Sequence, residues 1–470
     1  MLTPFERTVC DNAPVEKCTR VNIPPAFLGP ALPSPVLTMF PYLYVALAGK
    51  LAATFFDLYV TRRQHKRYAP HVVPSRRLAA IIPPAKFEQA QRYCRAKSSF
   101  QIFMAVLEAS IETLFLLNFL APRLWYFSAT LAPASELRQT LVFALLFGAL
   151  GMAVDLPASL YSTFVLEARF GFNRTTARTF VLDQLKQVFL SLLLGLPMLS
   201  ALFYVLRYFS TYNPITIAFG LWLLMSTFLV LIMLIYPSVI APMFNTFNPL
   251  PEGQLKNKLV AMANRLAFPL NKMYVIDGSR RSSHSNAYVF GLFKKNICIY
   301  DSLIDQCKGN DDQVVSVLCH EIGHVAYRHT VLGVLIALVQ VFITSLLYGL
   351  TTGNEDLYRS FGYHEGMPHV IGLLLLNELM APLGELMSPL ANMLSRHFEY
   401  QADAFAKEQG MAEDLGKALV GMSIANLSNM SPDPFYSTWN YSHPTLLERL
   451  DALNVTPEYE AESQVSKKDD

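Results

Sequence analysis

The sequence predicts a mainly α-helical membrane protein with seven transmembrane helices. Of its 470 residues, 52% are hydrophobic and only 16% are charged, whereas an ordinary soluble domain carries roughly 25% charged residues. The mean hydropathy of +0.30 indicates that much of the apolar surface faces something other than a protein core. This composition excludes a disordered chain. The near balance of 38 basic and 36 acidic residues gives no reason to expect a nucleic-acid partner.

Seven stretches of the chain are long and apolar enough to be membrane spans, since a helix needs about 20 mostly apolar residues to cross the hydrocarbon core. The fourth, fifth and sixth contain no charged residue, and the others contain one or two each. No cleavable signal peptide is expected, because the first 34 residues are polar and proline-rich. The stretches are Leu37–Val60, Ile102–Leu120, Leu141–Val165, Val188–Leu206, Ile215–Ile240, Val331–Leu350 and Val370–Met393.

The charged residues inside these stretches have two interpretations. Charges within a span are costly and usually line a wet cavity, which would make them the walls of an internal chamber. The alternative is ion pairing between helices, for example between Lys50 and a carboxylate. The acidic residues concerned are Glu108, Glu112, Asp155, Glu378 and Glu385.

The basic residues of the short loops predict the orientation, because loops rich in Lys and Arg stay in the cytoplasm. The loop between the first two spans contains ten basic residues, and Glu88 is its only acid. Seven spans then place the amino terminus in the lumen and the carboxyl terminus in the cytoplasm. We expect a lumenal tail (1–34), helices one to five (35–242), a first cytoplasmic segment (243–330), helices six and seven (331–394), and a second cytoplasmic segment with the tail (395–470). The two cytoplasmic segments are expected to form one domain.

The strongest signal for chemistry lies in residues 320–324, which read His-Glu-Ile-Gly-His and form an HExxH pattern. Positions i and i+4 share one face of a helix, so His320 and His324 can converge on one metal ion with Glu321 beside the attacking water. A helix is expected because Asn310 offers an amino-terminal cap and two acids follow it. The alternative is a chance match in a helix whose histidines have other partners.

A catalytic zinc needs a third protein ligand and an open position, and Glu399 after the seventh span is the best candidate. Asp403 follows one helical turn later and is expected to accept the outer N–H of a zinc-bound histidine. His397 is a rival ligand, but it lies on a different helix face from Glu399, so we expect it to be structural. Cys319 is expected to pack rather than to ligate, because it points about 100° away from its neighbour His320.

Other segments carry features that belong with this pattern: Ser282–Gly291, Tyr441–Pro444 leading to Glu448 and Arg449, Gly171–Asn173, and Leu250–Gly253. Together with the HExxH pattern and Glu399-x-x-x-Asp403, they closely resemble the integral-membrane zinc CAAX prenyl proteases, the a-factor-converting or farnesylated-protein-converting enzymes. The resemblance extends from about the first span to beyond His443. The first 34 residues lie outside it.

The resemblance implies a seven-helix barrel around a large water-filled chamber, covered on its cytoplasmic side by a gluzincin-type zinc metalloprotease domain with a small β-hairpin or sheet. It implies one Zn²⁺ per chain, held by His320, His324 and Glu399. It also implies farnesylated or geranylgeranylated CaaX protein or peptide substrates, which are cut after the modified cysteine to release three residues; some members make a second upstream cut. The implied location is the endoplasmic reticulum membrane, with the inner nuclear membrane as a second candidate. The lipid bilayer is then a partner and nucleic acid is not.

In this chemistry Glu321 takes a proton from the attacking water and passes it to the leaving amine. From the family pattern, His443 donates to the developing oxyanion, and Arg449 holds the surrounding helix or Glu399 in place. These roles, with that of Asp403 as a partner of a zinc-bound histidine, complete the expected catalytic centre.

The residues around Asn286, Ala287 and Tyr288 predict a short strand beside residues 296–300, joined by a turn at Lys294–Lys295. The exposed edge of such a strand offers backbone groups to an extended substrate. The alternative for Asn286 is a simple turn residue.

Two alternative functions compete with the prenyl protease. A membrane quality-control metallopeptidase that acts on misfolded or translocon-blocking proteins would use the same zinc chemistry, but seven spans and the segment around Asn286 favour the prenyl protease. A catalytically silent receptor or scaffold is disfavoured, because it has no need of a base beside an open three-ligand site.

The two ends of the chain add two expectations. Lys467 and Lys468 near the carboxyl end resemble the dilysine retrieval signal of endoplasmic-reticulum membrane proteins, the alternative being a charged, solvated terminus. Cys10 and Cys18 would lie in the oxidising lumen and could form a disulfide, although two free thiols would look the same in the sequence.

Overall fold

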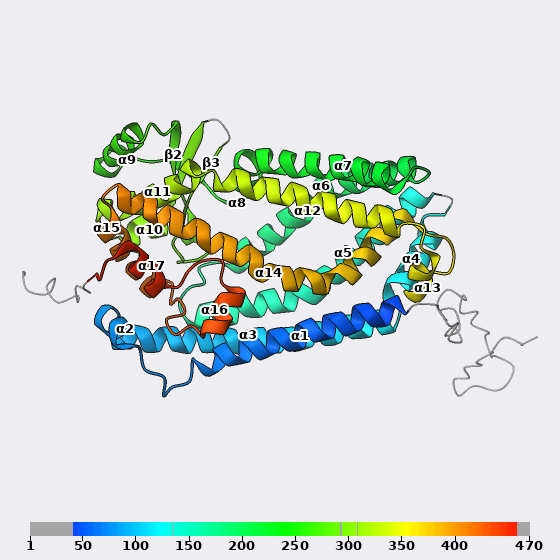
Figure 1. The fold of residues 1–470 in the computed structure, drawn as a ribbon, viewed down its shortest axis with the longest axis horizontal. Helices are drawn as coiled ribbons and strands as arrows, with labels where there is room; N and C mark the ends of the chain where they lie inside the picture. The colour runs from blue at the N-terminus through cyan, green and yellow to red at the C-terminus, as the bar shows by residue number, and fades with distance from the viewer. Residues whose placement is uncertain (1–40, 134, 292–293, 308, 458–470) are drawn as a thin grey trace, which may run out of the picture.

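The computed structural model describes residues 41–133, 135–291, 294–307 and 309–457. Within them, seven helices are long and apolar enough to cross a membrane, which confirms the seven predicted spans. Residues 37–40 of the first predicted span, Cys10, Cys18 and the dilysine pair all lie outside the described residues. The seven helices run alongside one another (Figure 1). They are α1 (Tyr42–Lys66), α3 (Pro84–Leu117), α5 (Glu136–Tyr161), α6 (Ala177–Phe209), α7 (Pro214–Ile235), α12 (His329–Thr351) and α14 (His369–Glu408).

Several of these helices continue well past the predicted spans. The 34 residues of α3 and the 40 residues of α14 correspond to about 51 and 60 Å at 1.5 Å per residue, whereas the hydrocarbon core is about 30 Å thick. The basic loop before Ile102 is therefore largely helical. Pro84 occupies the first turn of α3, where its missing N–H costs nothing.

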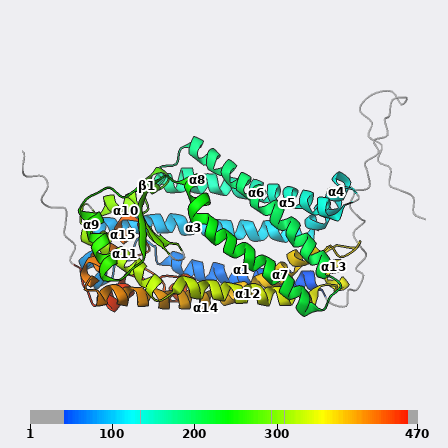
Figure 2. The ribbon, with the colours of Figure 1, turned by 90° about the horizontal axis from the view of Figure 1, so that it is seen from above.

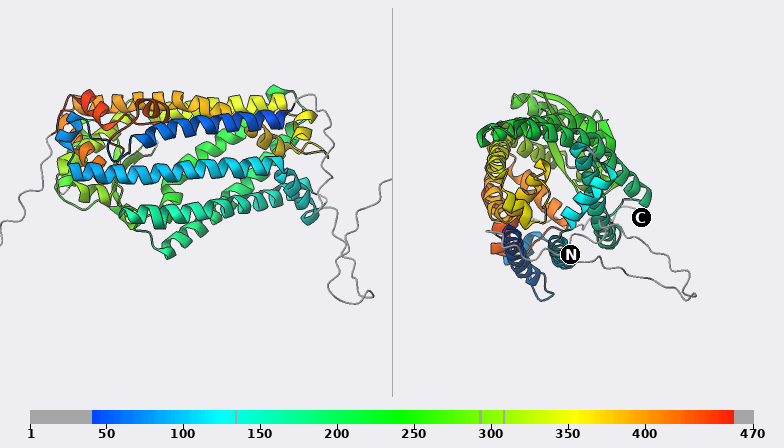
Figure 3. Two further views of the ribbon diagram at one scale, coloured as in Figure 1. Left: turned by 90° about the horizontal axis from the view of Figure 1, so that it is seen from below. Right: turned by 90° about the vertical axis from the view of Figure 1, so that its right-hand side faces the viewer.

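The seven helices form a ring when the molecule is viewed end-on (Figure 3). Every residue from Gly148 to Pro157 of α5 is exposed, which covers nearly three turns and therefore all sides of the helix. The side of α5 that faces the inside of the ring is therefore not covered by other described residues. This agrees with a hollow interior lined by helices.

The ion-pair interpretation of the charged span residues is confirmed for Lys50. Lys50 of α1 donates hydrogen bonds to Glu112 of α3 and to Glu378 of α14, so these three charges tie three helices together. Glu108, Asp155 and Glu385 are exposed, and Asp155 lines a pocket between α5 and α6; for these three residues the chamber wall stays a prediction.

A smaller domain lies at one end of the seven helices, on the left of Figure 1. The short helices α4 (Leu120–Leu131) and α13 (Glu355–Ser360) lie at the other end, as Figure 2 also shows. The sheet of the smaller domain has the strand order β1-β2-β4-β3, with β2 and β4 parallel and the other neighbours antiparallel. The predicted pairing of the strand at Ala287 with that at Asn296 is confirmed, and β3 is an edge strand. The strands are β1 (Phe247–Pro249), β2 (Leu270–Ile276), β3 (Ala287–Phe290) and β4 (Lys295–Tyr300).

The helices of this domain come from both sides of α12 in the sequence. Leu318 and Ile297 from the first part share one buried apolar cluster with Leu415 and Ala418 from the second. One core thus joins the two segments. The helices are α2 (Arg76–Ile81), α8 (Ala241–Phe244), α9 (Gln254–Arg265), α10 (Asp301–Gln306), α11 (Asp311–Ala326), α15 (Ala412–Ala425), α16 (Pro434–Asn440) and α17 (Leu446–Leu453).

Candidate metal centre

Helix α11 carries the HExxH residues and begins where the sequence predicted, with Asn310 accepting a hydrogen bond from the backbone N–H of Gln313. Its apolar face is buried in the core of the domain. Gly323 allows α14 to come very close, because a Cβ at this position would lie only 3.1 Å from the Cα of Ala402. The two helices therefore meet beside the histidines.

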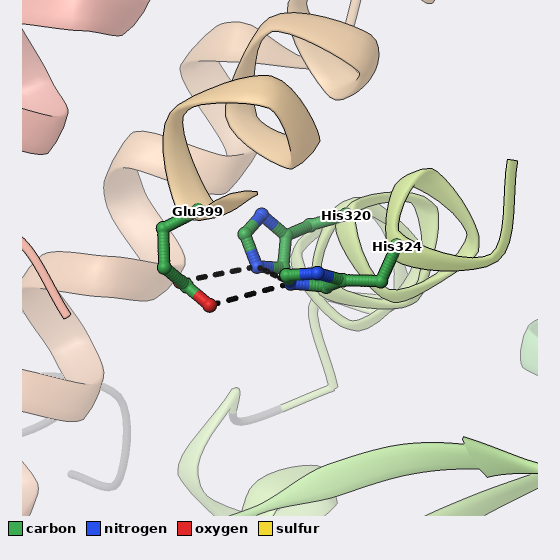
Figure 4. Close-up of side chains that lie close together, drawn as sticks. All are labelled: His320, His324 and Glu399. Carbon is green, nitrogen blue, oxygen red and sulfur yellow. Dashed lines mark hydrogen bonds and ion pairs between the residues drawn. The ribbon is translucent and has the colours of Figure 1, made fainter. Parts of the chain in front are cut away.

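Three side chains converge at this crossing, two from α11 and one from α14 (Figure 4). The Nε2 atoms of His320 and His324 are 3.2 Å apart. Glu399 places Oε2 at 3.5 Å from His320 Nε2, and Oε1 at 3.3 Å from His324 Nε2. His320 and Glu399 are both 5% exposed, so the cluster is shielded from bulk water on that side.

The residues present fit a bound cation. Glu399 Oε2 is buried without an aligned hydrogen bond from the described residues, and the nitrogens of His443, His320 and Arg449 lie 3.0, 3.5 and 3.6 Å from it. Burial lowers the pKa of His320, but hydrogen bonds with Asp403 and Glu399 outweigh this effect and leave its pKa raised. The centre is therefore electrostatically suited to positive charge, and imidazole with carboxylate is a common donor set for transition metals.

Asp403 and Arg449 support His320 from behind. The outer nitrogen of His320, Nδ1, lies 2.9 Å from Asp403 Oδ1 and 3.3 Å from Nη2 of Arg449. Arg449 donates two hydrogen bonds to Asp403, at 2.9 and 2.6 Å, and also lies 3.6 Å from Glu399 Oε2. Arg449 comes from α17, whose first turn is fixed by a capping box between Thr445 and Glu448.

His443 and Glu321 are the two residues expected to act on the substrate and the attacking water. The Nδ1 atom of His443 is 3.0 Å from Glu399 Oε2, and its side chain is 66% exposed, so it can reach a ligand from the open side. Glu321 follows His320 on α11, and burial raises its pKa above the ordinary value because the charged form loses hydration. A carboxylate with a raised pKa is a better proton acceptor near neutral pH.

Two family models together match almost all of the described residues. Residues 64–246 match the family model described as CAAX prenyl protease N-terminal, five membrane helices, and residues 249–456 match the model of Peptidase family M48. The chain belongs to the CAAX prenyl protease family. It is accordingly a membrane metalloendopeptidase of the CAAX-processing type.

Individual relatives agree with the family assignment. The CAAX prenyl protease 1 homolog of Oryza sativa is 41% identical, over 88% of this chain and 97% of the relative. The CAAX prenyl protease 1 of Saccharomyces cerevisiae is 35% identical, over 89% of this chain and 96% of the relative. The crystal structure of S. mikatae Ste24p superposes with a TM-score of 0.84 at 35% identity, covering 88% of this chain and all of the other. The fold predicted from the resemblance is therefore confirmed.

The edge strand β3 lies against the helix that carries the two histidines. Ala287 and Val289 face the core that buries α11, whereas Asn286 is exposed and its Oδ1 accepts a hydrogen bond from the N–H of Ala287. The backbone carbonyl of Asn286 accepts a hydrogen bond from the N–H of Tyr300, so Asn286 extends the pairing of β3 with β4. Tyr288 is half-buried and contacts the ring of Tyr300.

Two segments typical of the family meet in front of β3. Phe172 stacks on the ring of His284 with the centroids 4.3 Å apart, and Asn173 pairs with Ser282. The segment that leads into β3 is thereby fixed to the end of α5. Residues 171–173 and 282–291 are far apart in the sequence, and this contact explains why both carry family features.

The structure separates the rival ligands from the cluster. His397 is exposed and does not belong to the group formed by His320, His324 and Glu399. Cys319 is completely buried in the apolar core behind α11.

Sequence reasoning missed His329 and Gln401. His329 is buried at the start of α12, with its Nδ1 2.8 Å from His324 Nδ1, and Gln401 of α14 lies 2.9 Å from its other nitrogen. The available signal was a third histidine five positions after His324, but on a continuous helix that position faces away from the metal.

Proposed function

We propose that this chain is a zinc-dependent endopeptidase of the endoplasmic reticulum membrane that cleaves isoprenylated CaaX-type carboxyl termini and releases the terminal tripeptide. The triangle formed by His320, His324 and Glu399 carries the proposal. The two Nε2 atoms are 3.2 Å apart, and each lies close to a different oxygen of Glu399, His324 at 3.3 Å from Oε1 and His320 at 3.5 Å from Oε2. Ligand atoms about 2.0–2.1 Å from a tetrahedral Zn²⁺ are about 3.3 Å apart, so these contacts are of the size expected around a bound zinc ion.

His320, His324 and Glu399 would hold the metal, which supplies Lewis acidity at this position when bound. Glu321 accepts the proton of the attacking water and delivers it to the nitrogen of the leaving tripeptide. Asp403 and Arg449 keep His320 in the orientation that directs Nε2 to the metal. Each of these residues acts through a contact that its place on α11, α14 or α17 provides.

Substrate positioning is assigned to the open side of the centre. An extended CaaX segment would pair with the free edge of β3, at the level of Asn286, Ala287 and Tyr288. The carbonyl of Asn286 faces β4 and accepts from Tyr300, and the N–H of Ala287 would exchange its contact with the Asn286 side chain for one with the substrate. His443 is exposed beside Glu399 and would donate a hydrogen bond to the carbonyl oxygen as it gains negative charge.

The position of the centre suits a lipid-modified substrate. His324 precedes the first residue of the span α12 by five positions, so the site lies at the membrane surface. An isoprenoid adds about 0.8 kcal/mol of membrane affinity per buried CH₂ group and would keep the modified cysteine at that level. The relatives that match this chain are named CAAX prenyl proteases, which supports the same substrate class.

We assign the domain that holds the metal centre to the cytoplasmic side. The basic loop after α1 lies at this end of the molecule, because Arg63 contacts Asp433 and Arg77 contacts Asp451. Loops rich in basic residues remain in the cytoplasm. The carboxyl-terminal dilysine pair would then face the cytoplasm, where a retrieval signal for the endoplasmic reticulum is read.

The test offers purified full-length protein a farnesylated CaaX peptide and its unprenylated twin, with and without a metal chelator. We expect chelator-sensitive cleavage confined to the prenylated peptide, with release of its last three residues and recovery on addition of Zn²⁺. Equal cleavage of the twin and of unfolded chains would instead indicate membrane quality control. Unchanged cleavage after complete removal of the metal would refute the proposed chemistry.

A further inference from the structure

The two histidines of the metal centre differ in what supports them from behind. His320 is backed by the carboxylate of Asp403, at 2.9 Å, which is the usual partner of a metal-binding imidazole. His324 is backed by a second imidazole, with 2.8 Å between its Nδ1 and the Nδ1 of His329. His329 is 6% exposed.

Two aromatic side chains lie nearly parallel to the ring of His329. Phe398 stacks on it with the centroids 4.1 Å apart and the planes inclined by 11°. Tyr327 is nearly parallel to it at 5.8 Å. Phe398 precedes Glu399 on α14, so the element that supplies the third side chain of the triangle also fixes the plane of His329.

The hydrogen-bonding groups around His329 allow one arrangement of protons. Its Nε2 lies 2.9 Å from Oε1 of Gln401, and an amide oxygen can only accept a hydrogen bond, so Nε2 carries the hydrogen. In a neutral imidazole the other nitrogen is then an acceptor. The short contact with His324 therefore requires that His324 Nδ1 donates to His329 Nδ1.

This arrangement determines the state of the nitrogen that faces the triangle. With its hydrogen on Nδ1, neutral His324 presents a lone pair at Nε2, which points toward Glu399 and His320. The opposite tautomer would place a hydrogen at Nε2, and this nitrogen could then not bind a metal. The tautomer of His324 is thus set by Gln401 through His329.

We propose that His329 is a positioning residue that fixes the tautomer and ring direction of His324 and thereby sets the affinity of the metal centre. The proposal rests on the proposed function, since it takes His324 as a metal ligand. The break between α11 and α12 makes the contact possible: Arg328 has φ 57°, and this left-handed residue turns His329 back toward His324.

The test compares two substitutions of His329, one that can still accept a hydrogen bond from His324 and one that cannot. His329→Asn keeps a carbonyl oxygen near the place of Nδ1 and can still accept from His324. His329→Phe keeps a ring for stacking on Phe398 but accepts nothing. His397→Phe serves as the matched control, because His397 is an exposed histidine of α14 outside the triangle.

Zn²⁺ affinity of each full-length protein is measured by competition with a chromophoric chelator, and the visible spectrum of the Co²⁺-loaded protein reports the ligand geometry. Loss of the partner of a metal-binding histidine typically weakens binding about 10- to 100-fold. We expect this loss and a shifted Co²⁺ spectrum for His329→Phe. His329→Asn should stay within a few-fold of wild type, and the control should be unchanged.

A third variant keeps the proposal testable if His329→Phe does not fold, as judged by thermal unfolding of the metal-free protein. Gln401→Leu removes the acceptor that orients His329 and should weaken Zn²⁺ binding while leaving both histidines in place. Wild-type affinity in folded His329→Phe or Gln401→Leu would overturn the proposal, as would equal loss in the Asn and Phe variants. Wild-type protein that binds no metal would refute the metal centre itself, which distinguishes the two failures.

Discussion

Replacing Gly323 by alanine should separate the two helices that form the metal centre. The added Cβ would lie 3.1 Å from the Cα of Ala402 and 3.1 Å from the Cβ of Phe405, whereas carbon atoms in contact prefer about 3.5–4.0 Å. Helices α11 and α14 must therefore move apart by about 0.4–0.9 Å. Metal–ligand distances tolerate only about 0.2 Å, and Glu399 lies on the helix that moves.

The size of the effect follows from the strain. Overpacking a core costs about 1–3 kcal/mol, and the metal-free protein can relieve this strain by letting the helices separate. Binding must then restore the close approach, so the affinity for Zn²⁺ should fall about 5- to 150-fold, since 1.4 kcal/mol corresponds to a factor of ten. Chelator competition on Gly323→Ala measures this loss directly.

Gly333→Ala is the matched control, because Gly333 also lies inside a helix and a Cβ there would meet no atom within 4 Å. It should bind Zn²⁺ like wild type and unfold at the same or a slightly higher temperature, since alanine favours a helix over glycine by up to about 1 kcal/mol. Wild-type Zn²⁺ affinity in Gly323→Ala, with Gly333→Ala equally unaffected, would refute the steric argument.

Three further predictions concern the base, the membrane charges and the acid stability. Glu321→Gln should bind Zn²⁺ and unfold like wild type but lose about 10²- to 10⁴-fold in peptide turnover; normal turnover would exclude a general base. Lys50→Met leaves two carboxylates unpaired among the helices and should lower the unfolding temperature, and adding Glu378→Gln should recover part of the loss. Burial raises the pKa of Asp433, but the hydrogen bond from Arg63 and two backbone N–H groups outweigh it and leave the pKa lowered. The ionised Asp433 therefore stabilises the folded protein above about pH 4, and this contribution is lost as the pH falls through the lowered pKa. At pH 7, Asp433→Asn should be less stable than wild type by no more than about 1 kcal/mol. In acid, the difference in the free energy of unfolding should vanish.

The features that a local pattern encodes could be predicted from the sequence. Hydropathy finds the seven spans because the bilayer requires a fixed length of apolar helix. The spacing of His320 and His324, and that of Glu399 and Asp403, places each pair on one face of a helix. These predictions need no knowledge of the neighbouring elements.

The remaining contacts depend on tertiary structure. Arg449 reaches Asp403 across 46 positions of the sequence, and only the packing of α17 against α14 brings them together. His329 follows His324 by five positions, which on a continuous helix would turn it about 140° away. The left-handed Arg328 reverses this direction, and a non-glycine residue with positive φ has no reliable signature in the sequence.

The length of α14 constrains which insertions and deletions this chain can tolerate. One uninterrupted helix from His369 to Glu408 both crosses the membrane and presents Glu399, so there is no loop between them to absorb a change in length. A single inserted residue would rotate Glu399 by about 100° and shift it by about 1.5 Å, carrying it off the face that meets α11. The number of residues between His369 and Glu399 is therefore as restricted as the identity of the ligands. Length variation is expected instead in the connections before His369 and after Glu408.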